Sequence, residues 1–73
     1  MHMKNYDIRI TDGYSTEYCR GYAEGYGPMD ATENAVASGT VYVNNQPPEI
    51  PVQVIAINMA TGLAFKFEMA QAI

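Results

Sequence analysis

Four tyrosines recur at a spacing of four residues within segment 13–27, and this pattern limits what the segment can form. A spacing of four suits one face of a strand and, roughly, one face of a helix. The glycines separate the two, because Gly21 and Gly25 inside a helix would each cost about 1 kcal/mol relative to alanine. An extended, bending strand is therefore predicted, with small residues on one face. Its bulky face carries Tyr14, Tyr18, Tyr22 and Tyr26.

A β-hairpin is predicted between this strand and the residues before it. Residues 6–11 alternate apolar and charged side chains, and an Asp-Gly turn signal follows directly. A three-residue loop would place Ile8 opposite Tyr18 and Arg9 opposite Glu17. That register joins apolar to aromatic side chains on one face and opposite charges on the other. We therefore expect Tyr6 and Tyr18 to pack in the core with Ile8 and Ile10.

A helix is predicted over residues 30–44. Asp30 can cap its first turn, and Glu33 three residues later can complete a capping box. Small and apolar residues then recur at helical spacing. The β-branched residues near the end favour an alternative, in which the helix ends near Ser38 with a glycine C-cap and a short strand occupies residues 40–44.

A second hairpin is predicted from residues 52–59 and 63–69. The first segment is apolar almost throughout, which is typical of a central strand covered on both faces or nearly so. The second alternates, with Lys66 and Glu68 expected to point outward. Its side chains expected to point inward are Leu63, Phe65, Phe67 and Met69.

The element order is therefore ββαββ, which predicts an α+β fold. We expect an antiparallel sheet of about four strands with one helix packed on one face. A chain of 73 residues has room for one small domain, expected over residues 5–73. Residues 1–4 are interpreted as a disordered tail or a cloning remnant.

The length and the single cysteine limit stability and location. A chain this short buries only about 60% of its unfolded surface, so a monomer would be marginally stable. Cys19 cannot form an internal disulfide; we expect a small, half-buried residue in a reducing cytosol, with a reactive or intermolecular thiol as the alternative. No apolar run approaches the ~20 residues of a membrane span, and no signal peptide opens the chain. A cytoplasmic location and no membrane partner are expected.

The charge is unevenly distributed. Residues 21–65 contain no lysine or arginine, so the net charge of −4 lies in that stretch. Nucleic-acid binding depends on neutralising phosphates with such residues, which argues against direct nucleic-acid binding. An acidic surface suits a basic protein partner by electrostatic steering. Ordinary solubilising charge is the alternative.

The sequence contains too few of the residue types that catalysis or metal binding needs. His2 is the one histidine, so no Ser-His-Asp or Cys-His arrangement can form around it. A structural zinc site needs about four Cys or His ligands, and only His2 and Cys19 are present. The glycine-rich segment lacks the lysine of a phosphate loop. We expect no enzyme activity, no cofactor and no metal.

The exposed part of the tyrosine series is the best candidate for recognition. Tyr22 and Tyr26 extend past the end of the partner strand, which leaves interface and core use both open. Arg20 lies on the same face, either supporting a ring by a cation–π contact or acting as an exposed anchor. The predicted protein-binding residues are Arg20, Tyr22, Glu24, Tyr26, Asp30 and Glu33.

The chain combines small size and acidity with an alanine-bearing helix after a glycine-rich hairpin. A closing hairpin follows, from Val54-Ile55 to Gly62 and Phe65. Over residues 5–69 this layout resembles small phage-encoded anti-defence proteins, among them inhibitors of type I CRISPR surveillance complexes. The resemblance implies an inhibitor in the cytoplasm of a bacterial host. Such a protein would bind a crRNA-guided complex and block DNA access with an acidic and aromatic surface.

A structural or assembly module is the alternative. In that hypothesis the protein is an obligate homodimer whose long tyrosine strand pairs with its symmetry mate. Marginal size and free sheet edges favour dimerisation.

Overall fold

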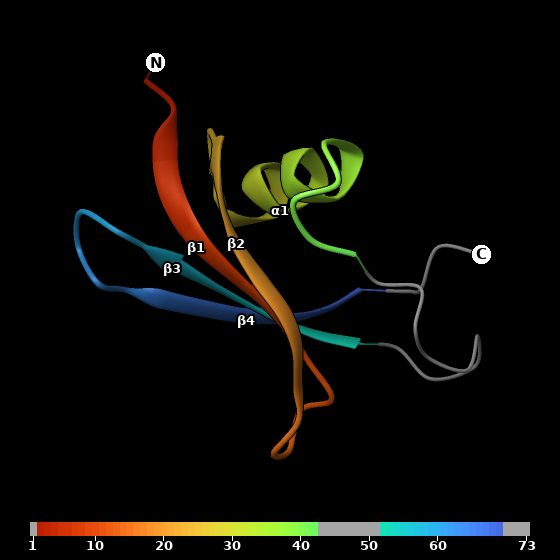
Figure 1. The fold of residues 1–73 in the computed structure, drawn as a ribbon. Coiled ribbons are helices and arrows are strands. Elements are labelled where there is room, and N and C mark those ends of the chain that lie inside the picture. Colours follow the sequence, from red (N-terminus) through yellow and green to blue (C-terminus); the bar gives the residue numbers. More distant parts are fainter. Residues whose placement is uncertain (1, 43–51, 70–73) are drawn as a thin grey trace.

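The computed structural model describes residues 2–42 and 52–69 (Figure 1). Within these residues, four strands form one antiparallel sheet in the order β2-β1-β3-β4. The predicted α+β class and the ββαββ order are confirmed. The elements are β1 (Lys4–Thr11), β2 (Glu17–Gly25), α1 (Pro28–Ala37), β3 (Val52–Asn58) and β4 (Ala64–Met69). β1 thus begins one residue before the expected start of the domain.

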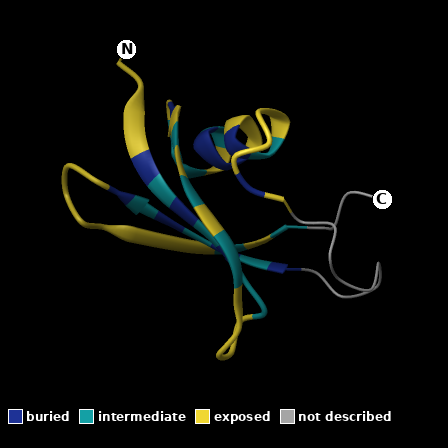
Figure 2. Ribbon diagram, viewed as in Figure 1, coloured by how far each residue is buried: buried dark blue, intermediate teal, exposed yellow. Residues whose placement is uncertain are grey.

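The core lies between α1 and one face of the sheet (Figure 2). β1 and β3 each bury every second side chain, as strands do when one face is covered. The helix adds small residues from its inner side. The fully buried apolar set is Tyr6, Ile8, Ile10, Ala31, Ala35, Val41, Val52, Val54 and Ala56. The prediction that Tyr6 packs in the core with the isoleucines of β1 is confirmed.

β2 pairs with β1 in a register that differs from the predicted one. Ile8 lies opposite Gly21 and Arg9 opposite Arg20. The predicted partners of Ile8 and Arg9, Tyr18 and Glu17, are therefore wrong. From Cys19 to Gly25 the shift is an odd number of residues, which moves every side chain of that stretch to the other face. The small face of β2 thus faces the core, and the bulky face points away from α1.

A longer loop and a bulge accommodate this register. The loop between the strands covers residues 12–16, and Thr11 pairs with Glu17. The next pair is Ile10 with Cys19. β2 therefore has one extra residue, Tyr18, between the two pairs, and this residue forms a β-bulge. Tyr18 is half-buried and packs against the edge of the core. It therefore contributes to the core from a bulge and not across the hairpin from Ile8.

The close approach of α1 and the turn after it to β2 explains the register. A Cβ atom added at Gly25 would lie 2.6 Å from the Cα of Ala31. One added at Gly21 would lie 3.2 Å from the carbonyl oxygen of Thr40 and still closer to the Thr40 side chain. Backbone atoms cannot move aside cheaply. A bulky side chain at either position would push the helix off the sheet, so the small face must be the inner one.

α1 is shorter than the predicted helix over residues 30–44. It ends at Ala37 with Ser38 as the C-cap, and Gly39 adopts a φ of 78°, the left-handed conformation that commonly ends helices. The alternative that ended the helix near Ser38 is correct about this end. Residues 40–42 form no strand, and the rest of that predicted strand lies outside the described residues. No helix in the described part of the chain is long and apolar enough to cross a membrane.

The start of α1 also differs from the prediction. Gly27 is the N-cap and makes no side-chain hydrogen bond, while Pro28 occupies the first helical position. The predicted capping box of Asp30 and Glu33 does not form. The carboxylate of Asp30 accepts a hydrogen bond of 2.9 Å from the backbone N–H of Tyr26. Asp30 thus fastens the first turn of the helix to the end of β2, where a negative charge also suits the helix dipole.

The last two strands are less covered than predicted. β3 is central, but its second face is only half-buried, because α1 covers one face of the sheet. α1 packs mainly over β2 and leaves the outer part of the sheet open (Figure 1). Leu63 and Phe65 are therefore 61% and 40% exposed, against the prediction that they are buried. Lys66 and Glu68 lie on the sheet face opposite the helix, which confirms their outward direction.

We predict that Gly25→Ala destabilises the fold by about 3 kcal/mol or more, because its Cβ would overlap the backbone of Ala31. The free energy of unfolding from urea denaturation measures this. Gly27→Ala is the matched control: its Cβ would meet no atom within 4 Å, and its φ of −155° suits any residue. A change within about 1 kcal/mol is expected there. Equal losses in the two variants would contradict the close-approach argument.

Candidate protein-binding surfaces

Three of the predicted binding residues share one face of β2. Arg20, Tyr22 and Glu24 alternate along the strand and lie on the sheet face away from α1, here called the open face. Tyr22 stands opposite Asp7 of β1 and is 67% exposed, so the prediction that it extends past the end of the partner strand is wrong. Tyrosines that remain this exposed offer a rigid apolar area with a polar tip to a partner.

The other three predicted residues lie at the turn from β2 into α1. Tyr26 follows the last residue of β2 and is 53% exposed. Its backbone is held by Asp30, and Glu33 lies on the exposed side of the helix. The side-chain amide of Asn34 donates a hydrogen bond of 2.9 Å to the backbone carbonyl of Glu24. The two groups thus belong to different faces of the molecule and meet at the end of β2.

The carboxylates of these two groups are not neutralised within the described residues. The ion pairs there join Arg9 to Asp7 at 3.1 Å, Arg9 to Glu17 at 4.0 Å and Arg20 to Glu17 at 2.9 Å. No described lysine or arginine lies within ion-pair distance of the carboxylates of Glu24, Asp30 and Glu33. The end of β2 and the start of α1 therefore carry uncompensated negative charge.

Arg20 differs from the other predicted residues because its side chain forms an ion pair within the protein. Its guanidinium donates to the carboxylate of Glu17, through Nε at 3.0 Å and Nη2 at 2.9 Å. The hydrogen bond and the charge of Glu17 raise the pKa of Arg20. Arg20 therefore fixes the start of β2 on the open face, and its charge is partly neutralised there.

The sheet also assembles a row of cations that the sequence interpretation missed. Arg20 lies opposite Arg9, Arg9 opposite Ile55, and Ile55 opposite Lys66, across all four strands. Three of the four lysines and arginines of the protein thus lie in one line on the open face. Only the pairing register reveals the row, since its members are up to 57 residues apart in sequence.

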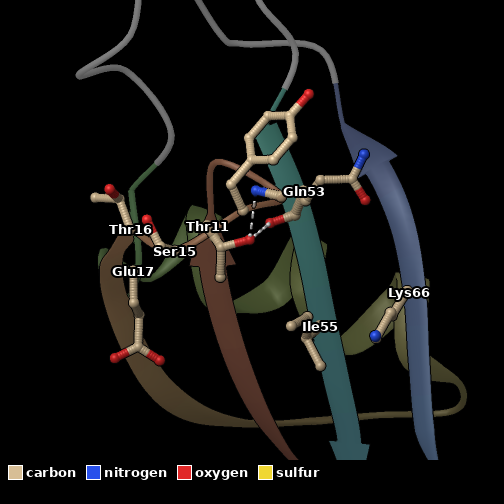
Figure 3. A pocket seen from close by; sticks show the side chains of 9 residues that line it. Thr11, Ser15, Thr16, Glu17, Gln53, Ile55 and Lys66 are labelled. Atoms are coloured by element: carbon tan, nitrogen blue, oxygen red, sulfur yellow. Dashed lines mark hydrogen bonds between the residues drawn. The ribbon is translucent and has the colours of Figure 1, made fainter.

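A shallow groove of about 240 Å³ lies on the open face between the β1–β2 loop and strands β3 and β4 (Figure 3). Gln53, Ile55 and Lys66 form one side and the loop forms the other. Its volume is below the ~300 Å³ at which small-molecule pockets begin. We therefore assign it no ligand. Within the described residues, no three His, Cys, Asp or Glu side chains gather to hold a metal ion.

The loop beside this groove is ordered by Asp12. Its carboxylate accepts hydrogen bonds from the backbone N–H groups of Tyr14 at 2.7 Å and Thr16 at 3.1 Å. The bond from Tyr14 contributes most, and together they lower the pKa of Asp12 from its ordinary 3.8. Tyr14, the first of the four tyrosines, is 95% exposed at the tip of this loop.

An apolar surface next to β4 is the second feature that the sequence interpretation missed. We define the β4 apolar surface as Leu63, Phe65, Phe67 and Met69. Phe65, Phe67 and Met69 lie opposite the buried Ala56, Val54 and Val52 of β3, so they share the core side of the sheet. Phe67 and Met69 are half-buried, whereas Leu63 and Phe65 are exposed, because α1 does not extend over them. The alternation that predicts an inward face cannot show whether anything covers it.

No family model, curated protein or solved structure matched this chain. The functional argument therefore rests on the surfaces described above.

We predict that Asp12 contributes stability above pH 3.8 that is lost as the pH falls toward its lowered pKa in the folded state. Asp12→Asn keeps an acceptor oxygen but cannot ionise. Between about pH 5 and 2, its unfolding free energy should therefore fall less than that of the wild type. An NMR titration of the Asp12 carboxyl with a midpoint at or above 3.8 would refute the assignment.

Proposed function

We propose that the protein is a non-catalytic protein-binding module that inhibits a larger protein or nucleoprotein complex by occupying its basic, nucleic-acid-binding surface. One observation carries the proposal: Tyr22 and Tyr26 are exposed beside carboxylates that no described cation neutralises. We name the acidic end as Tyr22, Glu24, Tyr26, Asp30 and Glu33.

The acidic end has the composition that such an interface needs. Tyrosine is enriched in protein interfaces, where its ring supplies buried area and its hydroxyl a hydrogen bond. Carboxylates attract the same lysines and arginines that otherwise neutralise phosphates, so they can compete with nucleic acid for them. The two arginines of this chain compete little for the carboxylates of the acidic end, because Asp7 and Glu17 already pair with them.

The backbone at this end is fixed before binding. The bond from Tyr26 N–H to Asp30 and the bond from the Asn34 amide to the Glu24 carbonyl join the end of β2 to α1. A preorganised surface loses less conformational entropy when a partner binds. These contacts support a role for the acidic end in recognition.

The layout resemblance to phage inhibitors of type I CRISPR complexes supplies the first target to test. A purified crRNA-guided surveillance complex would be mixed with the protein, and binding of target DNA would be measured by gel shift. Inhibition that weakens as salt rises is expected, since exposed charges are screened. Unchanged DNA binding at saturating protein would exclude this complex as the target, and affinity capture from bacterial lysate would then look for another.

We predict that Glu24→Lys or Glu33→Lys weakens binding of the captured partner, chiefly by slowing association. Surface plasmon resonance at two salt concentrations measures the rates. Ser15→Lys is the control, because it adds a positive charge at an exposed position in the β1–β2 loop, at the other end of β2 from the acidic end and away from β4. Association rates that Glu24→Lys and Glu33→Lys leave at the wild-type value would argue against an acidic interface.

We predict that Tyr22→Ala combined with Tyr26→Ala weakens binding roughly tenfold or more. Stability should change by less than about 1 kcal/mol, because both rings are largely exposed. Tyr14→Ala, which removes an exposed tyrosine outside the acidic end, should leave binding unchanged. If the double variant unfolds while residual binding survives, the two rings serve stability and the proposed role fails.

A further inference from the structure

The outer edge of β4 is unpaired within the described part of the chain. β4 ends the strand order and bonds only to β3. Asn58 N–H donates to the carbonyl of Leu63 at 2.9 Å, which fixes the alternation of the ladder. Because hydrogen-bonded pairs alternate along the ladder, the N–H and C=O groups of Phe65 and Phe67 point toward β3. Those of Lys66 and Glu68 point away from β3, toward the open edge. The edge therefore offers backbone donors and acceptors to another strand.

The β4 apolar surface borders the same edge. Phe65 is 40% exposed and Leu63 is 61% exposed, and Phe65 lies on the side of the sheet that carries the core. Figure 2 shows most of β4 coloured as exposed. A strand added at this edge would place its own side chains beside Phe65 and Phe67. An exposed apolar surface along a free strand edge is typical of a protein interface and is a hazard when left open.

The charges on β4 indicate which strand pairs with its free edge. We propose that two copies of this chain pair through antiparallel β4 strands, with Phe67 opposite the partner's Phe67. In this register Lys66 lies opposite the partner's Glu68, and Glu68 lies opposite the partner's Lys66. Phe65 lies opposite the partner's Met69. Opposite charges thus meet on the open face, and apolar side chains meet on the core side.

The neighbouring two-fold registers are unfavourable. Moving the axis by one residue in either direction places Lys66 opposite the partner's Lys66, or Glu68 opposite the partner's Glu68. Like charges directly opposite each other destabilise a strand pair. In the chosen register the outward backbone groups of Lys66 meet those of the partner's Glu68, as an antiparallel ladder requires. The neighbouring registers satisfy this requirement as well, so the charges decide among them.

The other edge of the sheet is a poorer place for a second copy. β2 carries the bulge at Tyr18, and a bulge twists an edge away from regular pairing. Its core side is already covered by α1, so pairing there would bury little further apolar surface. We therefore propose a dimer through β4 in place of the earlier hypothesis of a dimer through the tyrosine strand, β2. It also leaves the acidic end free, so this inference is independent of the proposed inhibitor role.

The mass of the wild type and its charge variants tests the pairing. Light scattering after size exclusion should give twice the 8.0 kDa of the chain for the wild type. Lys66→Glu and Glu68→Lys each place like charges opposite each other, which should weaken dimerisation roughly tenfold or more. Lys4→Glu, an equal charge change away from this edge, should leave the dimer intact.

Recombining the variants makes the test specific to the register. An equimolar mixture of Lys66→Glu and Glu68→Lys chains restores opposite charges at both pairs, so it should regain the dimer mass. The double variant Lys66→Glu with Glu68→Lys should also dimerise alone. A wild-type mass of one chain, or a dimer that neither single variant weakens, would overturn the proposal. Failure of the mixture to dimerise would overturn the register.

Amide hydrogen exchange tests the same pairing without any substitution. In a β4 dimer the N–H groups of Lys66 and Glu68 are bonded to the partner, so their exchange should slow as protein concentration rises. Protection of both amides in a protein with the mass of one chain would show that another part of the same chain covers the edge. That result would overturn the dimer, as would fast exchange of both amides at every concentration.

Discussion

The close contact of α1 and the turn after it with the glycines of β2 determines most of this structure. A Cβ atom at Gly25 would overlap the backbone of Ala31, and one at Gly21 would overlap the side chain of Thr40 and crowd its carbonyl oxygen. Close packing of interiors makes such contacts strict, because backbone atoms have little room to shift. The glycines are therefore needed to let the helix lie flat on the sheet. Their role in bending the strand is secondary to this contact.

That contact places the large residues of β2 on the outside. Since side chains alternate along a strand, a small inner face at Gly21, Ala23 and Gly25 forces Tyr22 and Glu24 onto the open face. The same contact keeps α1 near β2 and away from the outer edge of the sheet. The packing of α1 against β2 thus leaves tyrosines exposed at one edge of the sheet and phenylalanine side chains exposed at the other.

The two exposed edges have different chemistry. The acidic end combines aromatic rings with carboxylates that lack cation partners in the described residues, which suits a basic partner. The β4 apolar surface combines phenylalanines with alternating opposite charges, which suits a second copy of the same strand. Because they lie at opposite edges of the sheet, both can be occupied at once. A dimer would present two acidic ends and could bind a repeated partner with increased avidity.

The sequence by itself determined the element order, the α+β class and the core side of β1, because local periodicity and turn signals carry that information. It also predicted Lys66 and Glu68 on the outer side of β4. Only the tertiary structure decided the β2 register, the true end of α1 and the cation row across the open face. Cross-strand pairing alone favours Tyr18 opposite Ile8, but the close contacts of Gly25 with α1 and of Gly21 with the turn after it outweigh that preference. Periodicity shows which side chains share a face; what covers that face depends on where a distant element packs.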